Sequence, residues 1–269
     1  MLVATPIGNL GDITLRALET LKNADLIACE DTRTSAKLLS HYGISTRTFA
    51  YHEHNEASAT ARLVEQLQQG AQIALVSDAG TPLLSDPGSR LVQAAIAAGI
   101  TVTPLPGASA LLAALTMAGL AGGPFYFAGF LPPKTKAQHE MLTALKALPA
   151  TLVLYEAPHR LLETLETLQH VVGDRPAAVA RELTKLYEEC QRGTLSALIA
   201  HYTEHPPRGE CVVLVEGATT QDVMDADAID HALRDAMARL SLKEAVAEVT
   251  AASGQPRRLI YQRALELKA

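Results

Sequence analysis

The sequence predicts an α/β protein made of two domains and a helical extension at its C-terminal end. Three observations support this prediction. Short apolar runs typical of buried strands alternate with segments of helical period up to residue 215. The alternation restarts after the cluster Ala121-Gly122-Gly123-Pro124, and beyond residue 227 only helical patterns remain. We therefore place the domains at 1–120, 121–217 and 218–269.

In the first domain each predicted strand is followed by a helix. The strands span 2–4, 25–29, 49–51, 72–76 and 101–104, and the helices span 13–22, 35–42, 57–69, 89–98 and 110–117. Gly70, directly after the third helix, is typical of a helix C-terminus. Because strands joined by helical crossovers pair in parallel, this alternation predicts a parallel sheet.

The second domain repeats the pattern and leads into the extension. Its strands span 125–130, 151–155, 177–181 and 211–215, its helices span 136–148, 158–170 and 195–202, and a polar linker is predicted at 217–227. Ser241 and Glu244 form a capping-box signature at the start of a helix in the extension.

The last two helices of the extension are predicted to form a helix-turn-helix. The turn falls at 252–254, and Pro256 stands in the first turn of the second helix, where proline is tolerated. Four cations lie on or near this helix, namely Arg257, Arg258, Arg263 and Lys268. We expect them to contact nucleic acid, the alternative being a solvated basic face.

The composition limits the classes of protein that fit. A net charge of −6 excludes a protein that is basic overall, although a local basic patch suffices for RNA. Cys29, Cys190 and Cys211 show no CxxC spacing, which suits a reducing cytoplasm and excludes a zinc ribbon. The first residues lack the basic and apolar segments of a signal peptide.

One long stretch, residues 91–133, contains no charged residue. Glycines and prolines divide it into pieces shorter than the roughly 20 apolar residues that a membrane-spanning helix needs. We interpret it as buried strand, cleft and subunit contact, and we expect no membrane association.

The most distinctive segment is the loop Ser77-Asp78-Ala79-Gly80-Thr81-Pro82-Leu83-Leu84-Ser85-Asp86-Pro87-Gly88. It follows the strand predicted at 72–76, and ligands in open α/β sheets bind beyond the carboxyl ends of strands. Its glycines and prolines fix the backbone, and Asp78 and Asp86 place acceptors beside it. The residues alone leave a ligand loop and an ordinary connection as alternatives.

Two kinds of polar cluster leave alternatives open. His52, His54 and Glu56 would share one face of an extended chain, but without cysteine or a third histidine we expect a polar cleft edge and no metal site. The runs 156–160 and 181–185 end predicted strands and mix charges. Buried ion pairing of Glu182 with Arg160 or Arg181 is the structural alternative to a functional role.

Eight segments in this order carry a family resemblance: TPIGNLGDIT, EDTR, YHEHNE, SDAGTPLLSDPG, PGASA, GFLPPK, EAPHR and RELTK. Together they resemble the ribosomal RNA small subunit methyltransferase I family, a branch of the tetrapyrrole methylase-like (class III) S-adenosylmethionine enzymes. The resemblance spans nearly the whole chain, including the helix-turn-helix extension. It implies a two-domain fold with S-adenosylmethionine in the cleft between the domains, usually in a homodimer.

The resemblance also implies a reaction and a set of site residues. The reaction is methylation of a cytidine ribose 2′-hydroxyl in the decoding region of 16S rRNA, which releases S-adenosylhomocysteine. The implied cofactor-binding residues are Pro6, Asp78, Gly80, Leu83, Asp86, Gly107, Ala108, Ser109, Ala110, Tyr155 and Leu183. Asp78 and Asp86 would hold the methionyl part, and Leu83, Tyr155 and Leu183 would pack on adenine.

Methyl transfer from a sulfonium is mainly a problem of alignment, although a base near the hydroxyl helps. Glu182 and His54 are the candidate catalytic residues. Contacts with RNA phosphates are expected from Arg33, Lys134, Arg160, Lys185, Arg257 and Arg258. Two other functions stay open: a tetrapyrrole or small-molecule methylase, which needs no basic extension, and a non-catalytic nucleic-acid-binding regulator.

Overall fold

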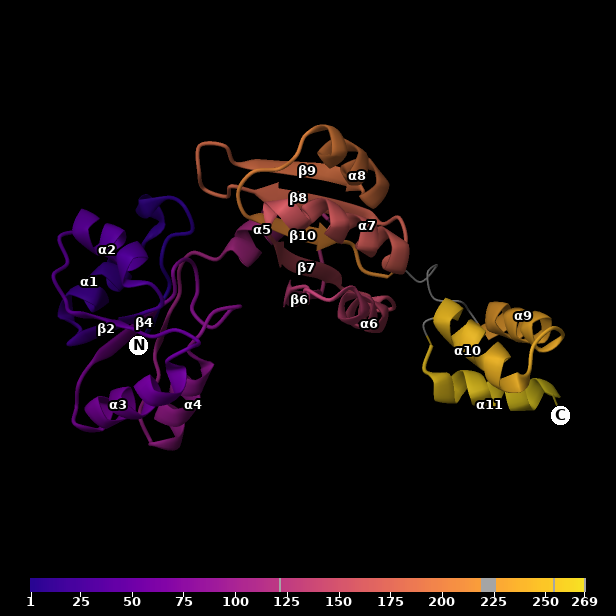
Figure 1. The fold of residues 1–269 in the computed structure, drawn as a ribbon, viewed down its shortest axis with the longest axis horizontal. Helices are drawn as coiled ribbons and strands as arrows, with labels where there is room; N and C mark the ends of the chain where they lie inside the picture. The colour runs from indigo at the N-terminus through magenta and orange to yellow at the C-terminus, as the bar shows by residue number, and fades with distance from the viewer. Residues whose placement is uncertain (121, 219–225, 254, 269) are drawn as a thin grey trace. The chain divides into compact units, whose positions relative to one another are not determined.

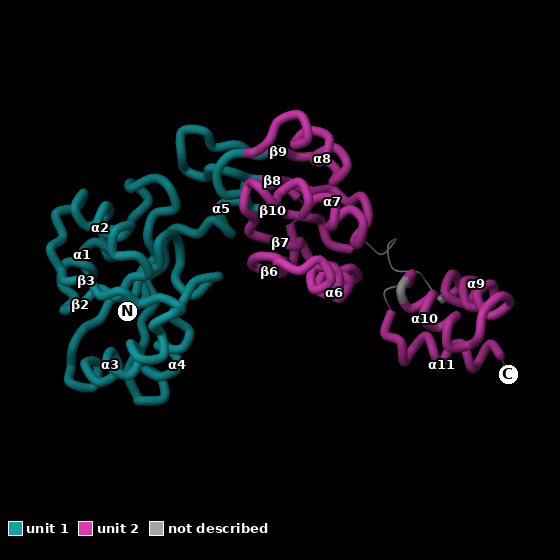
Figure 2. The backbone as a smooth tube through the Cα atoms, viewed as in Figure 1, with its two compact units in different colours: residues 1–117, 180–190, 208–212 teal, residues 118–179, 191–207, 213–269 magenta. Residues whose placement is uncertain are grey.

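A computed structural model describes residues 1–120, 122–218, 226–253 and 255–268. The chain forms two compact units (Figure 2). Unit 1 comprises Met1–Met117, Ala180–Cys190 and Arg208–Val212, and unit 2 comprises Ala118–Val179, Gln191–Pro207 and Val213–Ala269. Ala121, most of the predicted linker and Gly254 of the predicted turn lie outside the described residues, and the domain limits stay a prediction.

Unit 1 is built on a parallel sheet of order β3-β2-β4-β1-β5. Its strands are β1 (Leu2–Val3), β2 (Leu26–Cys29), β3 (Thr48–Ala50), β4 (Ile73–Val76) and β5 (Pro104–Leu105). Each register pair, such as Ile27 beside Ala74, joins strands that are separated in sequence by at least one helix. The parallel pairing predicted from the alternation is confirmed.

Helices cover both faces of this sheet (Figure 1). They are α1 (Leu15–Asn23), α2 (Thr32–His41), α3 (Glu56–Gln68) and α4 (Ser89–Ala97). The 3₁₀ turn η1 (Leu10–Asp12) precedes α1, and α5 (Ala110–Ala118) follows β5. Ile27 and Cys29 point into a core cluster with α1 and α2, whereas Leu26 and Ala28 point into one with α3 and α4. This alternation follows from the period of two in a strand.

The second sheet has the order β6-β7-β10-β8-β9. Its strands are β6 (Phe125–Phe130), β7 (Thr151–Glu156), β8 (Pro176–Arg181), β9 (Glu189–Thr194) and β10 (Cys211–Val215). The helices that follow them are α6 (Thr135–Leu145), α7 (Leu161–Val172), preceded by the 3₁₀ turn η2 (Pro158–Arg160), and α8 (Leu195–Glu204). Strand β10 is buried along its whole length, as expected for a central strand.

The sequence analysis missed β9. Its residues, Glu189 to Thr194, are polar or small and none is fully buried, so they lack the apolar pattern of a strand. It lies at the edge of its sheet, where burial imposes no such pattern. The other predicted elements are present, with ends that differ by a few residues.

The extension consists of α9 (Ala226–Met237), α10 (Leu242–Ser253) and α11 (Arg257–Lys268). The helices share one core, which includes Leu233, Val246 and Ile260. The predicted capping box is confirmed, because Glu244 accepts hydrogen bonds from the amide and hydroxyl of Ser241 at 3.1 and 2.7 Å. The pairing of α10 with α11 confirms the two helices predicted on either side of the turn.

Candidate cofactor site

The candidate site lies in unit 1, beyond the carboxyl ends of its parallel strands. We call three segments the strand-end loops: residues 5–9 after β1, 77–88 after β4 and 106–109 after β5. Because the strands β4, β1 and β5 are neighbours, their carboxyl ends meet at one edge of the sheet. Ligands of open α/β sheets bind at this edge.

Backbone hydrogen bonds hold the strand-end loops together. Thr5 and Gly80 form an isolated antiparallel bridge, in which each amide donates to the other's carbonyl at 2.9 Å. The hydroxyl of Thr81 donates to the carbonyl of Ala108 at 3.1 Å. Loop 77–88 is therefore tied to the loops that follow β1 and β5.

Loop 77–88 adopts a backbone that side chains normally disfavour. Leu83 and Ser85 have φ of 76° and 68°, in the left-handed region. Gly88 has φ of 126°, and a Cβ there would lie 2.7 Å from Leu75 Cδ2 and 2.8 Å from Leu83 Cδ2. Such conformations cost free energy, and they persist where the surroundings fix a functional loop.

Glu56 supports the far end of this loop. Its Oε1 accepts hydrogen bonds from the Gly88 amide at 3.2 Å and from the Tyr51 hydroxyl at 3.0 Å. Burial raises the pKa of Tyr51 to about 12, so its hydroxyl remains a donor. The carboxylate of Glu56 thereby joins the start of α3 to the start of α4.

A group of acidic side chains gathers at the same edge of the sheet. Asp78 Oδ1 accepts a hydrogen bond from the Asp31 amide at 3.0 Å. Burial raises the pKa of Asp86, and the carboxylates of Asp78 and Glu210 raise it further, against a hydrogen bond from Ser77 that lowers it. Burial also raises the pKa of Glu30, with Asp78 and Asp86 adding to the effect. Negative charge is thus incompletely compensated here.

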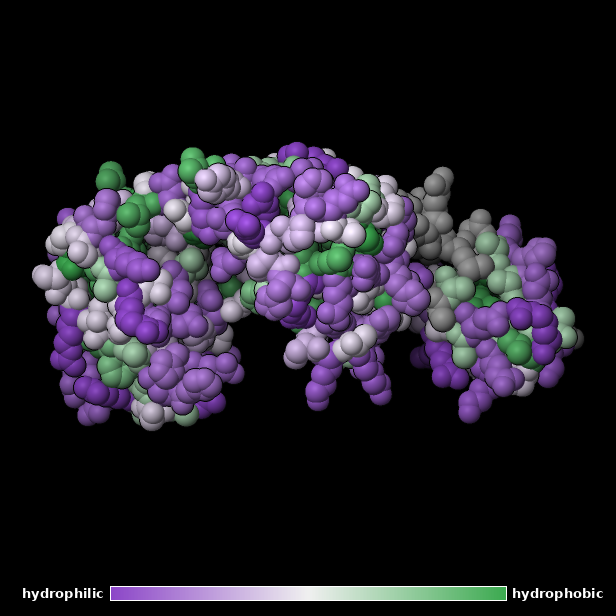
Figure 3. Space-filling view, turned by 45° about the horizontal axis from the view of Figure 1, so that its top comes forward, coloured by the Kyte–Doolittle hydropathy of each residue, from purple (hydrophilic) through white to green (hydrophobic). Residues whose placement is uncertain are grey.

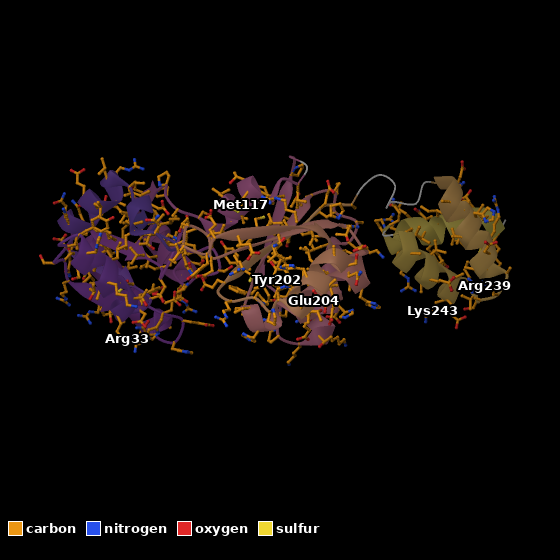
Figure 4. All side chains as sticks on the ribbon, turned by 90° about the horizontal axis from the view of Figure 1, so that it is seen from above. Arg33, Met117, Tyr202, Glu204, Arg239 and Lys243 are labelled. Atoms are coloured by element: carbon orange, nitrogen blue, oxygen red, sulfur yellow. The ribbon has the colours of Figure 1, made fainter. Side chains whose placement is uncertain are left out.

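Arg33 supplies little compensation to that group. It binds Asp31 through two guanidinium nitrogens, with Nη2 2.7 Å from Oδ2. These hydrogen bonds lower the pKa of Asp31 to about 2. The guanidinium lies at the outer surface of α2 (Figure 4) and is largely solvated.

The segment Glu182–Lys185 packs against the first strand-end loop. Glu182 and Thr184 have φ of 51° and 65°, and a Cβ on Gly8 would lie 2.5 Å from Lys185 Cγ and 3.0 Å from the carbonyl of Leu183. The hydroxyl of Thr184 is buried and has no hydrogen-bond partner among the described residues. A second strained loop with an unsatisfied polar atom therefore adjoins the strand-end loops.

Most predicted cofactor-binding residues fall in these segments. Ten belong to unit 1: Pro6, Asp78, Gly80, Leu83, Asp86, Gly107, Ala108, Ser109, Ala110 and Leu183. Tyr155 belongs to unit 2, where its ring contacts those of Phe127 and Phe130. Leu83 is half-buried and packs against the core under α3 and α4, while Leu183 is buried.

The two candidate catalytic residues differ in their surroundings. Glu182 accepts a hydrogen bond from Lys185 Nζ at 2.9 Å. His54 is exposed, in a turn that the Asn55 side chain closes by accepting from the His52 amide and donating to the carbonyl of Ala50. The extended chain considered for residues 52–56 is wrong, because a turn precedes α3, which begins at Glu56.

The ion pairs that the sequence analysis weighed for Glu182 are replaced by others. Arg181 pairs with Glu189, and Glu182 pairs with Lys185. Arg160 Nε lies 3.7 Å from the buried Glu156 carboxylate, and Arg160 Nη2 donates to the carbonyl of Leu131.

The cations predicted to contact RNA thus fall into two groups. Arg33, Arg160 and Lys185 are each engaged by a carboxylate. Lys134, before α6, and Arg257 and Arg258, at the start of α11, are exposed and form no ion pair among the described residues. In those same residues no group of three or more His, Cys, Asp or Glu could hold a metal ion, and no helix is long and apolar enough to cross a membrane.

The sequence of the chain matches a known protein family. The pattern described as "Tetrapyrrole (Corrin/Porphyrin) Methylases" matches residues 1–199. The chain belongs to this methylase family. It is therefore a methyltransferase whose methyl donor is S-adenosylmethionine. A second pattern, "RsmI C-terminal HTH domain", matches residues 223–268.

Curated relatives resemble the whole chain. The "Ribosomal RNA small subunit methyltransferase I" of Mesorhizobium japonicum is 53% identical over 99% of this chain and 91% of the relative. The protein of the same name from Synechocystis is 49% identical over 100% of this chain and 98% of the relative. Among solved structures, diphthine synthase matches with a TM-score of 0.64 at 16% identity, over 81% of this chain and 89% of that one, which shows the fold alone.

The residues at the strand-end loops fit the cofactor. S-adenosylmethionine carries a positive sulfonium and an ammonium group, and the partly buried carboxyls of Asp86 and Glu30 lie beside further carboxylates that would attract these charges. The unsatisfied hydroxyl of Thr184 offers a further polar contact. Glu30, Glu56 and Thr184 were missed as contributors, although each lies in a segment that carries the family resemblance.

We expect Gly88→Ala to disrupt the site through both strain and overlap. Its Cβ would overlap Leu75 and Leu83, so we expect a loss of about 2–3 kcal/mol in the free energy of unfolding and weaker S-adenosylmethionine binding. Gly99→Ala, beyond the other end of α4, is the matched control, because Gly99 also has positive φ (74°) but no atom within 4 Å of the added Cβ. Urea unfolding and calorimetric titration measure both effects. Equal losses of stability and of binding in the two variants would contradict the claim that overlap with Leu75 and Leu83 causes the effect.

Proposed function

We propose that the chain methylates 16S rRNA of the small ribosomal subunit in the cytoplasm, at the ribose 2′-hydroxyl of a cytidine in the decoding region. The observation that carries the proposal is the similarity of relatives named for small-subunit ribosomal RNA, which runs over nearly the whole chain. The match of the extension to a domain named from the same methyltransferase adds to it.

In this proposal the strand-end loops bind the cofactor. S-adenosylmethionine supplies an electrophilic methyl group when bound. Asp78 and Asp86 hold the methionyl part, together with the backbone from Gly80 to Leu83, and Gly107 to Ala110 contact the cofactor from the next loop. Gly107 keeps this loop close to β1, because a Cβ there would lie 2.7 Å from Ala4 Cβ. Leu183 and Tyr155 provide apolar surface for the adenine.

In this proposal Glu182 or His54 is the base that accepts the proton of the ribose hydroxyl. Glu182 is the better supported of the two, because its backbone is held at a φ of 51° and Lys185 Nζ orients its carboxylate by donating a hydrogen bond to it. Because transfer depends on aligning oxygen, methyl carbon and sulfur, the rigid loops contribute by positioning.

Electrostatic contacts with RNA come mainly from the cations that no carboxylate engages. Lys134, Arg257 and Arg258 are free to pair with phosphates, whereas Arg33, Lys185 and Arg160 would have to share or exchange a partner. A small-molecule methylase would have no use for the exposed cations of the extension. That difference favours the RNA substrate over a tetrapyrrole.

We propose further that the chain works as a homodimer. The uncharged stretch 91–133 leaves large apolar residues exposed in the single chain: Ile96, Leu112, Phe125, Tyr126 and Phe130. Phe130, for example, is 52% exposed. Phe125, Tyr126 and Phe130 all lie on β6, at the edge of the second sheet, and exposed apolar residues on one edge strand are typical of a surface that a second copy covers.

The acidic group predicts the pH dependence of cofactor binding. Because the pKa values of Asp86 and Glu30 are raised, these carboxyls take up protons at a higher pH than ordinary carboxyl groups do. Once they are protonated, their attraction for the sulfonium and the ammonium is lost. Affinity for S-adenosylmethionine therefore falls as the pH is lowered through the raised pKa values. Without ligand the sign is opposite: the free energy of unfolding falls as the pH rises through them.

Calorimetry at a series of pH values tests this. Asp86→Asn should weaken binding about tenfold at neutral pH and flatten the pH dependence. Asp235→Asn, on α9, is the control and should match the wild type. S-adenosylhomocysteine, which lacks the sulfonium charge, should show a shallower dependence. A wild-type affinity that does not vary with pH would remove the acidic group from the site.

Methyl transfer from labelled S-adenosylmethionine to purified small subunits tests the substrate. The wild type should label the small subunit in preference to free RNA of other sequence and to DNA. Arg257→Ala/Arg258→Ala should reduce the labelling and lower the salt dependence of binding by about 0.7–0.9 per lost phosphate contact. The charge-matched control Arg234→Ala/Arg239→Ala removes two cations that are already ion-paired. No labelling of the small subunit by the wild type would overturn the proposal.

Sedimentation equilibrium tests the dimer. The expected mass is twice the 28.6 kDa of the chain. Phe130→Glu should shift the equilibrium toward monomer, since it places a charge in the apolar surface. Leu15→Glu changes a residue that is 85% exposed outside this stretch and should not. A wild type that sediments as a monomer at all concentrations would refute the proposed homodimer.

A further inference from the structure

Ion pairs divide the cations of the three C-terminal helices into two sets. Arg263 binds Asp230 through two nitrogens at 2.6 and 2.7 Å and also binds Glu266. Arg239 binds Glu248 at 2.6 Å, and Arg234 lies 4.0 Å from Asp230. These three arginines therefore join the helices to each other or brace a single helix. Arg263, which the sequence analysis grouped with the nucleic-acid contacts, is thereby assigned to the packing.

The other set has no such partner. Among the described residues of α10 and α11, Lys243, Arg257, Arg258 and Lys268 form no ion pair. Lys243 lies on α10 (Figure 4), whereas the other three lie on α11. Hydrophilic residues predominate on the face of these helices that Figure 3 shows. The charges of α11 are thus available to a partner.

The three free cations of α11 share one side of the helix. Ile260 and Ala264 face the core, which fixes the orientation of α11. At 3.6 residues per turn, Arg257 and Arg258 stand one turn before Tyr261, and Leu265 and Lys268 follow on the same side. Glu266, the acidic residue of α11, falls on the opposite flank beside Arg263.

The side chains in the middle of this face are apolar and exposed. Tyr261 and Leu265 are each 45% exposed and do not belong to the core of the three helices. We call Arg257, Arg258, Tyr261, Leu265 and Lys268 the α11 face. It combines a flat aromatic ring and an aliphatic side chain with three positive charges.

The chemistry of the α11 face selects among partners. A second copy of the same face would set cations against cations. A duplex groove is read mainly by hydrogen bonds to base edges, for which Tyr261 and Leu265 are poorly suited. Unpaired RNA presents phosphates together with bases that stack on aromatic rings beside arginine.

We propose that the α11 face binds an unpaired segment of RNA, with Tyr261 stacking on one base and Arg257, Arg258 and Lys268 pairing with the flanking phosphates. The proposal rests on the proposed function only in taking the ribosomal RNA as the natural source of that segment. It implies that the helix-turn-helix recognises a loop or bulge and does not insert α11 into a duplex groove.

Fluorescence anisotropy with the full chain tests the proposal, using a short single-stranded RNA, an RNA duplex and a DNA duplex as probes. The wild type should prefer the single strand. Tyr261→Ala should weaken its binding about tenfold, and Tyr261→Phe should restore it, because stacking needs the ring and not the hydroxyl. Leu259→Ala is the matched control, since Leu259 is 53% exposed on the opposite flank of α11.

The outcomes separate this inference from the proposed function. Equal single-strand affinity of Tyr261→Ala and the wild type, or a preference of the wild type for duplex, overturns the α11 face even if small subunits are methylated. Loss of single-strand binding in Tyr261→Ala, with S-adenosylmethionine affinity and melting temperature unchanged, supports it even if methyl transfer to small subunits fails.

Discussion

The bridge between Thr5 and Gly80 is the constraint on which the rest of the site depends. Its two backbone hydrogen bonds join the loops after neighbouring parallel strands, and Thr81 extends the connection to Ala108. These contacts can form only when β1, β4 and β5 lie side by side in register. The sheet then holds the left-handed residues of loop 77–88 in place, and the free energy gained by forming the sheet offsets the cost of their conformation.

Acidic side chains in two different environments show how the fold separates structure from function. Glu156 is fully buried, and its carboxylate accepts from the Thr164 hydroxyl and the Ala157 amide while Arg160 lies nearby. Burial raises the pKa values of Asp86 and Glu30 instead, and the carboxylates around them raise these values further. A satisfied acid stabilises the fold, whereas a group of poorly compensated acids suits a positively charged ligand.

The cations show the same separation. Arg263 joins α11 to Asp230 of α9, so its charge is used within the fold. Arg257 and Arg258 extend from the same helix without a carboxylate partner among the described residues. Sequence alone cannot distinguish these arginines, because all three lie within seven positions of one helix. Which one pairs depends on the neighbouring helix that each faces.

The sequence by itself determined the order of strands and helices, the parallel pairing, the capping box at Ser241 and the family. These follow from local periodicity and from motifs, which the chain carries wherever it folds. The tertiary structure alone decided that Glu56 holds Gly88, that Glu182 pairs with Lys185, and that residues 52–55 form a turn. It also decided that the polar edge strand β9 exists. Partners of polar side chains are set by which strand ends meet in space, and no pattern along the chain records that.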